Sequence, residues 1–265
     1  MSVSLDESIH LHWQGEGQAL LLLHGWGMNG RVFDPFARLL AERGFRVGTV
    51  DLPGFGLSAP LEGGLSLEGL GDALLPHLPQ GCVLAGWSLG GMVATQLALA
   101  SPQRVSHLVT LASSPCFRAR DGWPGIKPRV LEGFAQALNQ DLTGTLERFV
   151  ALQAMGSASA RSDTKAIRAL LTEAPEPDPQ ALAQGLEILR DADQRPALAG
   201  VRQPWLRIYG RLDALVPSDS LAPMARLTPE SREAVLPKAA HAPFISHPQE
   251  TADLIQSFLG SAAPA

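Results

Sequence analysis

The segment Gly86-Trp87-Ser88-Leu89-Gly90 constrains the fold of this chain more than any other feature. It follows an apolar run at residues 82–85 and leads into residues 92–99, where apolar side chains recur at helical spacing. A Gly-x-Ser-x-Gly pattern between a strand and a helix is typical of a sharp turn that presents its serine hydroxyl above a sheet. We therefore predict that Ser88 is a nucleophile. The alternative is an ordinary strand–helix turn in which the Ser88 side chain caps the helix.

Strands and helices alternate on both sides of this turn. The predicted strands are residues 9–13, 19–23, 46–50, 82–87 and 107–112, and later 205–209 and 232–236. The predicted helices between and after them are residues 33–43, 67–78, 218–227 and 249–259. Such alternation indicates an α/β fold whose mostly parallel sheet is covered by helices on both faces.

The pattern changes in the middle of the chain. No strand is indicated from about residue 118 to 193, and helices are predicted over 131–138, 142–155, 164–171 and 179–189. We interpret residues 118–194 as a helical cap inserted into a core made of residues 1–117 and 195–260. Residues 261–265 are rich in alanine and proline and are expected to form a disordered tail.

Composition narrows the class of protein. The 265 residues are 45% hydrophobic and 18% charged, with a net charge of −5, which gives no reason to expect nucleic acid or a membrane as partner. The first residues lack the pattern of a signal peptide, and the longest apolar run is residues 19–23. Cys82 and Cys116 do not make a disulfide framework and are interpreted as core residues. We expect a cytoplasmic monomer.

A serine hydroxyl becomes a nucleophile when a histidine, oriented by a carboxylate, takes its proton. With this kind of turn, the chain order is serine, acid, histidine. Asp213 follows the strand at 205–209 through a glycine turn, and His241 lies between the last strand and the final helix. We therefore predict a Ser88, Asp213, His241 triad. Competitors are Asp219, which follows Pro217 into a helix, and His247, which precedes Pro248 at a helix start.

Ester cleavage also needs hydrogen-bond donors for the negative oxygen that develops. We expect the backbone amides of Leu89, which follows the nucleophile, and Trp26, which lies between two glycines after an early strand. The Trp26 indole would line the acyl side of the site. For Trp87, a place in the site and a place in the core are equally good interpretations. Asp51 is expected to make turn hydrogen bonds. No spacing indicates a metal or dinucleotide site, so no cofactor is expected.

These motifs, with His24-Gly25-Trp26-Gly27 and residues 51–56, resemble the α/β-hydrolase superfamily. Four segments extend the match: Gly86 to Gly91, residues 112–117, residues 123–128 and residues 238–248. Of these, Ser113-Ser114-Pro115-Cys116-Phe117 and Trp123-Pro124-Gly125-Ile126-Lys127-Pro128 are not generic to the superfamily. Together they resemble the pimeloyl-[acyl-carrier protein] methyl ester esterases of biotin biosynthesis, and the resemblance runs from about residue 20 to 259.

The resemblance implies a cofactor-free serine carboxylesterase. It would cleave the methyl ester of a pimeloyl chain held on acyl-carrier protein, releasing methanol, with side activity on short-chain esters. The substrate-binding residues that it implies are Trp26, Ser88, Leu89, Phe149, Val150, Ala151, Leu152, Gln153 and His241.

The resemblance also implies a docking surface for the acidic carrier protein. Arg148, Arg161 and Lys165 match basic positions of the family's cap, whereas Gly144 stands where the family has another cation. The alternative interpretation of these cations is a solvated helix face.

Two other functions remain open. The same triad serves C–C hydrolases, lactonases and acyltransferases, and some receptors keep the fold without catalysis. Epoxide hydrolases and haloalkane dehalogenases are disfavoured, because they would need an aspartate in place of Ser88.

Overall fold

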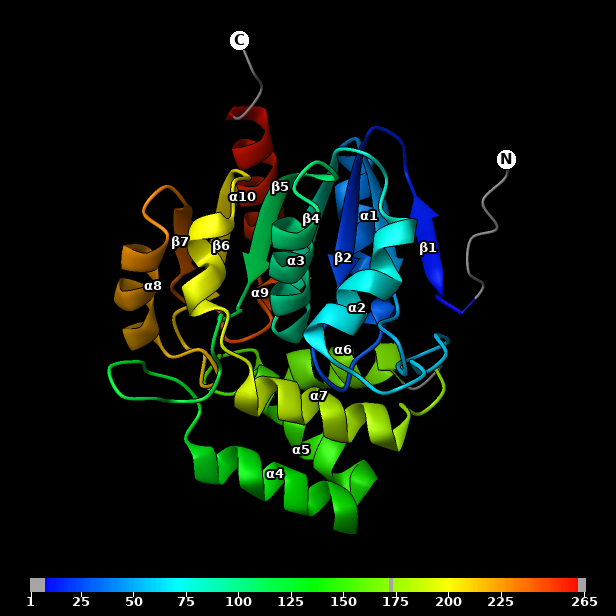
Figure 1. The fold of residues 1–265 in the computed structure, drawn as a ribbon, viewed down its shortest axis with the longest axis vertical. Helices are drawn as coiled ribbons and strands as arrows, with labels where there is room; N and C mark the ends of the chain where they lie inside the picture. The colour runs from blue at the N-terminus through cyan, green and yellow to red at the C-terminus, as the bar shows by residue number, and fades with distance from the viewer. Residues whose placement is uncertain (1–7, 172–173, 262–265) are drawn as a thin grey trace.

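The computed structural model describes residues 8–171 and 174–261 (Figure 1). Apart from Ser261, the predicted tail lies outside the described residues. Within the described part, no helix is both long enough and apolar enough to cross a bilayer. Cys82 and Cys116 are free and fully buried, which confirms their interpretation as core residues.

A seven-stranded sheet forms the centre of the molecule, with the strand order β1-β3-β2-β4-β5-β6-β7. Only β1 is antiparallel to its neighbour, so the predicted α/β fold with a mostly parallel sheet is confirmed. The strands are β1 Leu11–Gln14, β2 Gln18–Leu23, β3 Phe45–Val50, β4 Cys82–Trp87, β5 Val105–Leu111, β6 Trp205–Gly210 and β7 Arg232–Leu236. Every residue of β4 is buried, as expected for a central strand covered on both faces.

Helices cover the two faces of the sheet. On one face α1 (Asp34–Glu42) contacts α10 (Pro248–Ser261), and on the other α2 (Leu67–Leu74) contacts α3 (Leu89–Ala100) (Figure 1). Nine of the twelve α3 residues are buried, which is why its sequence is apolar nearly all round. The shorter elements are η1 Gly30–Phe33, η2 Leu75–His77, η3 Arg195–Gly200, η4 Ser218–Ser220, α8 Leu221–Leu227 and α9 Pro243–Ser246.

Four helices are inserted between β5 and β6, as predicted. They are α4 Pro128–Gln140, α5 Leu142–Gln153, α6 Ala160–Leu171 and α7 Pro179–Asp191, and in Figure 1 they lie across the end of the sheet toward which its parallel strands point. In the described part of the insertion there is no strand, only isolated bridges from Arg118 to Ile126 and from Arg120 to Trp123. We call these four helices the cap. Its proposed limits at residues 118 and 194 remain a prediction.

Several helix boundaries differ from the sequence predictions, and proline explains one of them. The helix predicted over 67–78 ends at Leu74 and continues as the 3-10 turn η2, because Pro76 has no amide hydrogen to continue the α-helical pattern. The short helix α9 was not predicted, since four residues are too few to show a period.

Candidate active site

Ser88 occupies the turn between β4 and α3 in a strained conformation. Its φ of 55° and ψ of −120° lie in a region that residues with side chains rarely adopt, and such strain costs about 1–3 kcal/mol. A Cβ atom on Gly86 would collide with the Gly90 carbonyl, and one on Gly90 with the Leu23 carbonyl. The Ser88 side chain makes no helix-capping hydrogen bond, so the capping alternative is wrong.

Three hydrogen bonds fix the backbone of this turn. The Ser88 amide donates to the Leu111 carbonyl at 3.0 Å, and the Gly91 amide donates to the Ser88 carbonyl at 2.9 Å. The same carbonyl accepts a second hydrogen bond of 2.7 Å from the Ser113 hydroxyl. Because Ser113 follows β5, the neighbouring strand stabilises the turn. The sequence analysis included Ser113 only as part of a family motif and did not predict this contact.

Asp213 and His241 form a closed pair. His241 Nδ1 and Asp213 Oδ2 are 2.7 Å apart, and both side chains are fully buried. Asp213 Oδ1 accepts from the amides of Leu215 at 2.8 Å and Val216 at 3.0 Å, so the loop after β6 orients the carboxylate. Because the carboxylate accepts from Nδ1, the second ring nitrogen of His241 is left as a proton acceptor.

The main chain of His241 is held from two sides. Its amide donates to the Gln153 carbonyl at the end of α5 at 3.0 Å. Its carbonyl accepts from the Trp87 indole at 2.7 Å, and the Trp87 and His241 ring centroids are 5.8 Å apart. Trp87 is thus both a buried core residue and a support for the candidate base. The competitors lie elsewhere: Asp219 is in η4, and His247 directly precedes α10.

The two amides expected to bind the oxyanion are free of protein acceptors in the described part of the chain. Leu89 begins α3, where the helix dipole favours negative charge, and Trp26 lies in the loop after β2. The Trp26 indole is buried against the cap: its Nε1 donates to the Leu182 carbonyl at 2.8 Å. The Trp26 and Phe149 rings pack edge to face, with their centroids 4.6 Å apart. Trp26 therefore joins the core loop to both α5 and α7.

His24 was not predicted to contribute to the site, yet it braces the loop that carries Trp26. Its Nδ1 donates to the Gly25 carbonyl at 2.8 Å, and its Nε2 accepts from the Leu52 amide at 2.9 Å. Burial lowers the pKa of His24, so the neutral ring that this pairing requires is favoured. The sequence feature that could have indicated this role is the position of His24, which directly precedes Gly25 in the loop after β2.

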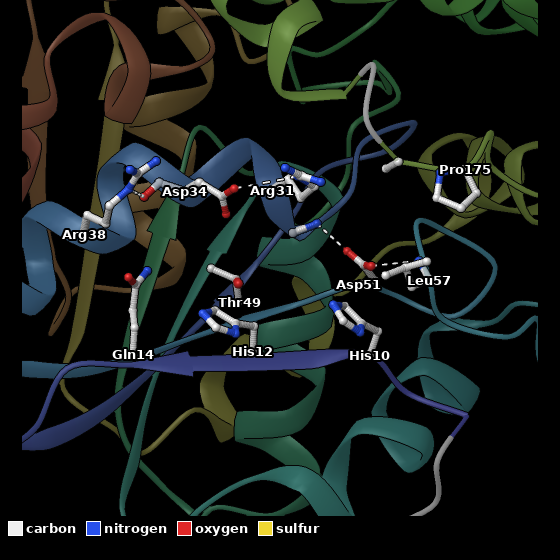
Figure 2. Close-up of a pocket in the computed structure, with 12 residues that line it drawn as sticks. His10, His12, Gln14, Arg31, Asp34, Arg38, Thr49, Asp51, Leu57 and Pro175 are labelled. Carbon is white, nitrogen blue, oxygen red and sulfur yellow. Dashed lines mark hydrogen bonds and ion pairs between the residues drawn. The ribbon is translucent and has the colours of Figure 1, made fainter.

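Asp51 makes turn hydrogen bonds, as predicted. Its two carboxylate oxygens accept from the amides of Gly30 at 2.6 Å and Leu57 at 2.8 Å (Figure 2). It lines a cavity of about 330 Å³ with His12 of β1 and with His10, which directly precedes that strand. The cavity contains no residue of the predicted triad. Since both oxygens of Asp51 are already paired, its role is to connect η1 to the loop after β3.

The five cap residues implied by the resemblance do not share one face. Phe149, Val150 and Gln153 are buried on the side of α5 that is turned to the core. Ala151 and Leu152 instead line a separate, open groove of about 580 Å³ between α5 and α6. The structure therefore brings Phe149 and Gln153 toward Trp26 and His241, but not Ala151 and Leu152.

This groove contains two of the three cations predicted for docking. Arg161 and Lys165 line it together with Met155 and with Arg168, which was not among the predicted docking residues. Met155 is 47% exposed. Arg148 is outside this groove, donates to the Thr145 hydroxyl at 2.8 Å and lies 4.0 Å from Asp141. We call Ala151, Leu152, Met155, Gly156, Ala160, Arg161, Thr164, Lys165 and Arg168 the α5–α6 groove.

The chain is similar to known proteins over most of its length. A family model described as alpha/beta hydrolase fold matches residues 18–248. The pimeloyl-[acyl-carrier protein] methyl ester esterase of Aeromonas hydrophila is 51% identical over 262 residues, 98% of this chain and 100% of the relative. The protein of that name from Klebsiella pneumoniae is 52% identical over 239 residues, 89% of this chain and 92% of the relative. Among solved structures, an esterase from Exiguobacterium antarcticum matches with a TM-score of 0.86 at 24% identity, over 95% of each chain. The chain belongs to the alpha/beta hydrolase fold family and, within it, to the pimeloyl-[acyl-carrier protein] methyl ester esterases.

Proposed function

We propose that this protein hydrolyses the methyl ester of a pimeloyl chain carried on acyl-carrier protein and releases methanol. The main support for this reaction is the buried pair Asp213 and His241, whose Oδ2 and Nδ1 atoms are 2.7 Å apart. The strained backbone of Ser88 in the turn between β4 and α3 is the second support. The substrate class is supported by relatives of that name that are about half identical over nearly the whole chain.

In the proposed acylation step, His241 Nε2 takes the proton of the Ser88 hydroxyl as its oxygen attacks the ester carbonyl. Asp213 stabilises the imidazolium that forms. By holding Nδ1, it also orients the His241 ring so that Nε2 is available to Ser88. The amides of Trp26 and Leu89 donate to the oxyanion, and a single donor of this kind contributes about 10²–10³ in kcat. Methanol leaves with the proton from His241, and the pimeloyl chain remains on Ser88 as an ester.

Deacylation repeats these steps with water as the nucleophile. His241 takes a proton from water, the oxygen attacks the acyl carbonyl, and Ser88 leaves with the proton that His241 returns. The products are methanol and a free carboxylic acid on the carrier. No metal or cofactor is needed to balance either step.

The α5–α6 groove is the docking surface that we propose for the carrier protein. Arg161, Lys165 and Arg168 provide cations for an acidic partner, and the exposed Met155 provides apolar contact. Arg148 lies outside the groove, and we propose that its charge adds to the positive electrostatic potential there at longer range. The helix α5 contributes Ala151 and Leu152 to this groove and, through the Gln153 carbonyl, a contact to the His241 amide.

Charge reversal tests the proposal. Arg161 and Lys165 would both be changed to Glu, and the rates of carrier-linked pimeloyl methyl ester and p-nitrophenyl butyrate hydrolysis would be compared. The matched control reverses two exposed arginines outside the cap, Arg202→Glu with Arg226→Glu, so that net charge changes equally.

We expect the cap variant to lose about tenfold or more in kcat/KM for the carrier-linked ester and to keep its rate on the short ester, because long-range attraction acts on the charged partner alone. The control variant should lose far less. An equal loss in both variants would contradict the docking surface. A wild type that cleaves only the short ester would contradict the proposed substrate.

A further inference from the structure

Gln153 has a buried side-chain oxygen that no protein group satisfies. It is the last residue of α5 and only 1% exposed. Its Nε2 donates to the Phe149 carbonyl at 2.9 Å, but its Oε1 is buried and has no hydrogen-bond partner among the described residues. A buried acceptor without a hydrogen bond destabilises the folded protein, so its presence calls for an explanation.

The main chain of Gln153 contacts the candidate base, His241. Its main-chain carbonyl accepts from the His241 amide at 3.0 Å. Phe149, one turn earlier on the same face of α5, packs against Trp26 at 4.6 Å. The buried face of α5 therefore extends from the loop of the proposed oxyanion amide to the candidate base.

A second unsatisfied acceptor belongs to His241 itself. Its Nε2 is buried and also lacks a protein partner in the described part of the chain, while Nδ1 is engaged by Asp213. In the proposed mechanism the Ser88 hydroxyl donates its hydrogen to Nε2 before acylation, a hydrogen bond that is not formed in the described structure. Once Ser88 is acylated, its oxygen has no hydrogen left, so both acceptors then require a donor from elsewhere.

We propose that Gln153 positions the water molecule that hydrolyses the acyl-enzyme. Water has two hydrogens: one is donated to Gln153 Oε1 and the other to His241 Nε2. His241 takes its hydrogen as the water oxygen bonds to the acyl carbon, and the bond from that carbon to Ser88 Oγ breaks as His241 returns the proton to Oγ. The hydrogen held by Gln153 stays on the hydroxyl of the product acid. This inference rests on the proposed serine esterase mechanism.

The proposal makes Gln153 selective for water over methanol. Methanol has a single O–H hydrogen, which must go to His241 if methanol is to attack. It therefore gains nothing from Gln153 Oε1. Since methanol is the first product of the proposed reaction, such selectivity would suppress its return to the acyl-enzyme.

Partitioning of one acyl-enzyme between the two nucleophiles tests this directly. p-Nitrophenyl butyrate would be supplied in buffer containing methanol, and butyric acid and methyl butyrate would be measured as products. The variants are Gln153→Met, which removes the acceptor, and Gln153→Glu, which keeps an acceptor oxygen but removes the donor to Phe149. Ser88→Ala tests separately whether a serine acyl-enzyme exists.

Gln194 provides a matched control. It is also a buried glutamine whose Nε2 donates to a carbonyl, that of Met92 at 3.0 Å, and whose Oε1 is unpaired in the described structure. Its amide donates to the Pro115 carbonyl, so neither contact involves Ser88, Asp213 or His241. Gln194→Met therefore removes an unsatisfied acceptor without touching the candidate base.

We expect Gln153→Met to reduce hydrolysis about tenfold and to raise the ratio of methyl butyrate to butyric acid by a similar factor. Gln153→Glu should return the ratio toward wild type, and Gln194→Met should leave it unchanged. A wild-type ratio in Gln153→Met, or a Gln153→Glu ratio as high as that of Gln153→Met, would overturn the proposal. Undiminished activity of Ser88→Ala would instead overturn the proposed mechanism.

Discussion

Ser88 holds a backbone conformation that its own side chain disfavours, so neighbouring residues must stabilise it. The most specific of these contacts is the Ser113 hydroxyl, which donates to the Ser88 carbonyl at 2.7 Å. Gly91 makes this possible, because a Cβ there would collide with the Ser113 side chain. Ser113 therefore connects the end of β5 to the proposed nucleophile.

Replacing Ser113 with alanine should lower kcat on p-nitrophenyl butyrate about three- to tenfold and the free energy of unfolding by about 1 kcal/mol, because one buried hydrogen bond is lost. Ser114→Ala is the control, since that hydroxyl donates to the Cys116 carbonyl at 2.8 Å instead. It should lose similar stability and little activity. Equal losses of activity in the two variants would show that Ser113 has no special role at the elbow.

His24 predicts a pH dependence of stability. Burial lowers its pKa below the ordinary value of 6.5 in the folded protein. The unfolded chain therefore binds a proton near pH 6.5 while the folded chain does not, and stability falls as the pH drops from 6.5 toward the lowered pKa. Burial lowers the pKa of His107 as well, which adds to the fall in the same direction.

Chemical denaturation of the wild type and His24→Gln at several pH values checks this prediction. The variant should be less stable at neutral pH, because two buried hydrogen bonds change, but its stability should fall less steeply below pH 6.5. The difference in slope is at most about 1.4 kcal/mol per pH unit, and His107 contributes equally to both proteins. Identical slopes would mean that His24 is not kept neutral by burial.

At the scale of elements, the sequence was most informative where one strand or turn determines the outcome. The bounds of β4 and β7 match their predictions residue for residue, since an apolar run bounded by turn residues defines a short strand well. The triad candidates could be chosen because each one follows a predicted strand. Parallel strands bring the loops after their carboxyl ends to the same end of the sheet.

Contacts between the core and the cap were beyond sequence reasoning. The Trp26 indole and the Leu182 carbonyl that it binds are 156 residues apart, and the acceptor belongs to the main chain of an ordinary leucine. The same holds for the His241 amide and the Gln153 carbonyl. Only tertiary packing brings such pairs together, so no local period or motif encodes them.

Trp26→Phe tests the connection between α7 and the core. It keeps an aromatic ring against Phe149 but leaves the Leu182 carbonyl without its donor, so local opening of α7 should cost less free energy. Amide hydrogen exchange in α7 is expected to accelerate several-fold, with α3 unaffected. Trp205→Phe is the control, because that indole donates to Thr110 within the sheet at 3.0 Å. Equal exchange rates in α7 of wild type and Trp26→Phe would contradict the connection.

At the scale of the whole molecule, the proposed catalytic residues lie between two layers. The core supplies Ser88, Asp213 and His241 from the loops at one edge of the sheet, and these side chains are almost fully buried. The cap lies over that edge, and its helix α5 presents Phe149 and Gln153 inward and contributes to the α5–α6 groove. One helix thus connects the proposed carrier-docking surface to the proposed acyl site.

The most direct test of this account is the release of methanol from pimeloyl-[acyl-carrier protein] methyl ester by the wild type and by Ser88→Ala, with the fold of the variant checked by its unfolding midpoint. We expect rapid release by the wild type and a loss of at least about 10³-fold in kcat for the variant, because the nucleophile is removed. Methanol release by folded Ser88→Ala at near the wild-type rate, or none by a wild type that still cleaves p-nitrophenyl butyrate, would contradict the account.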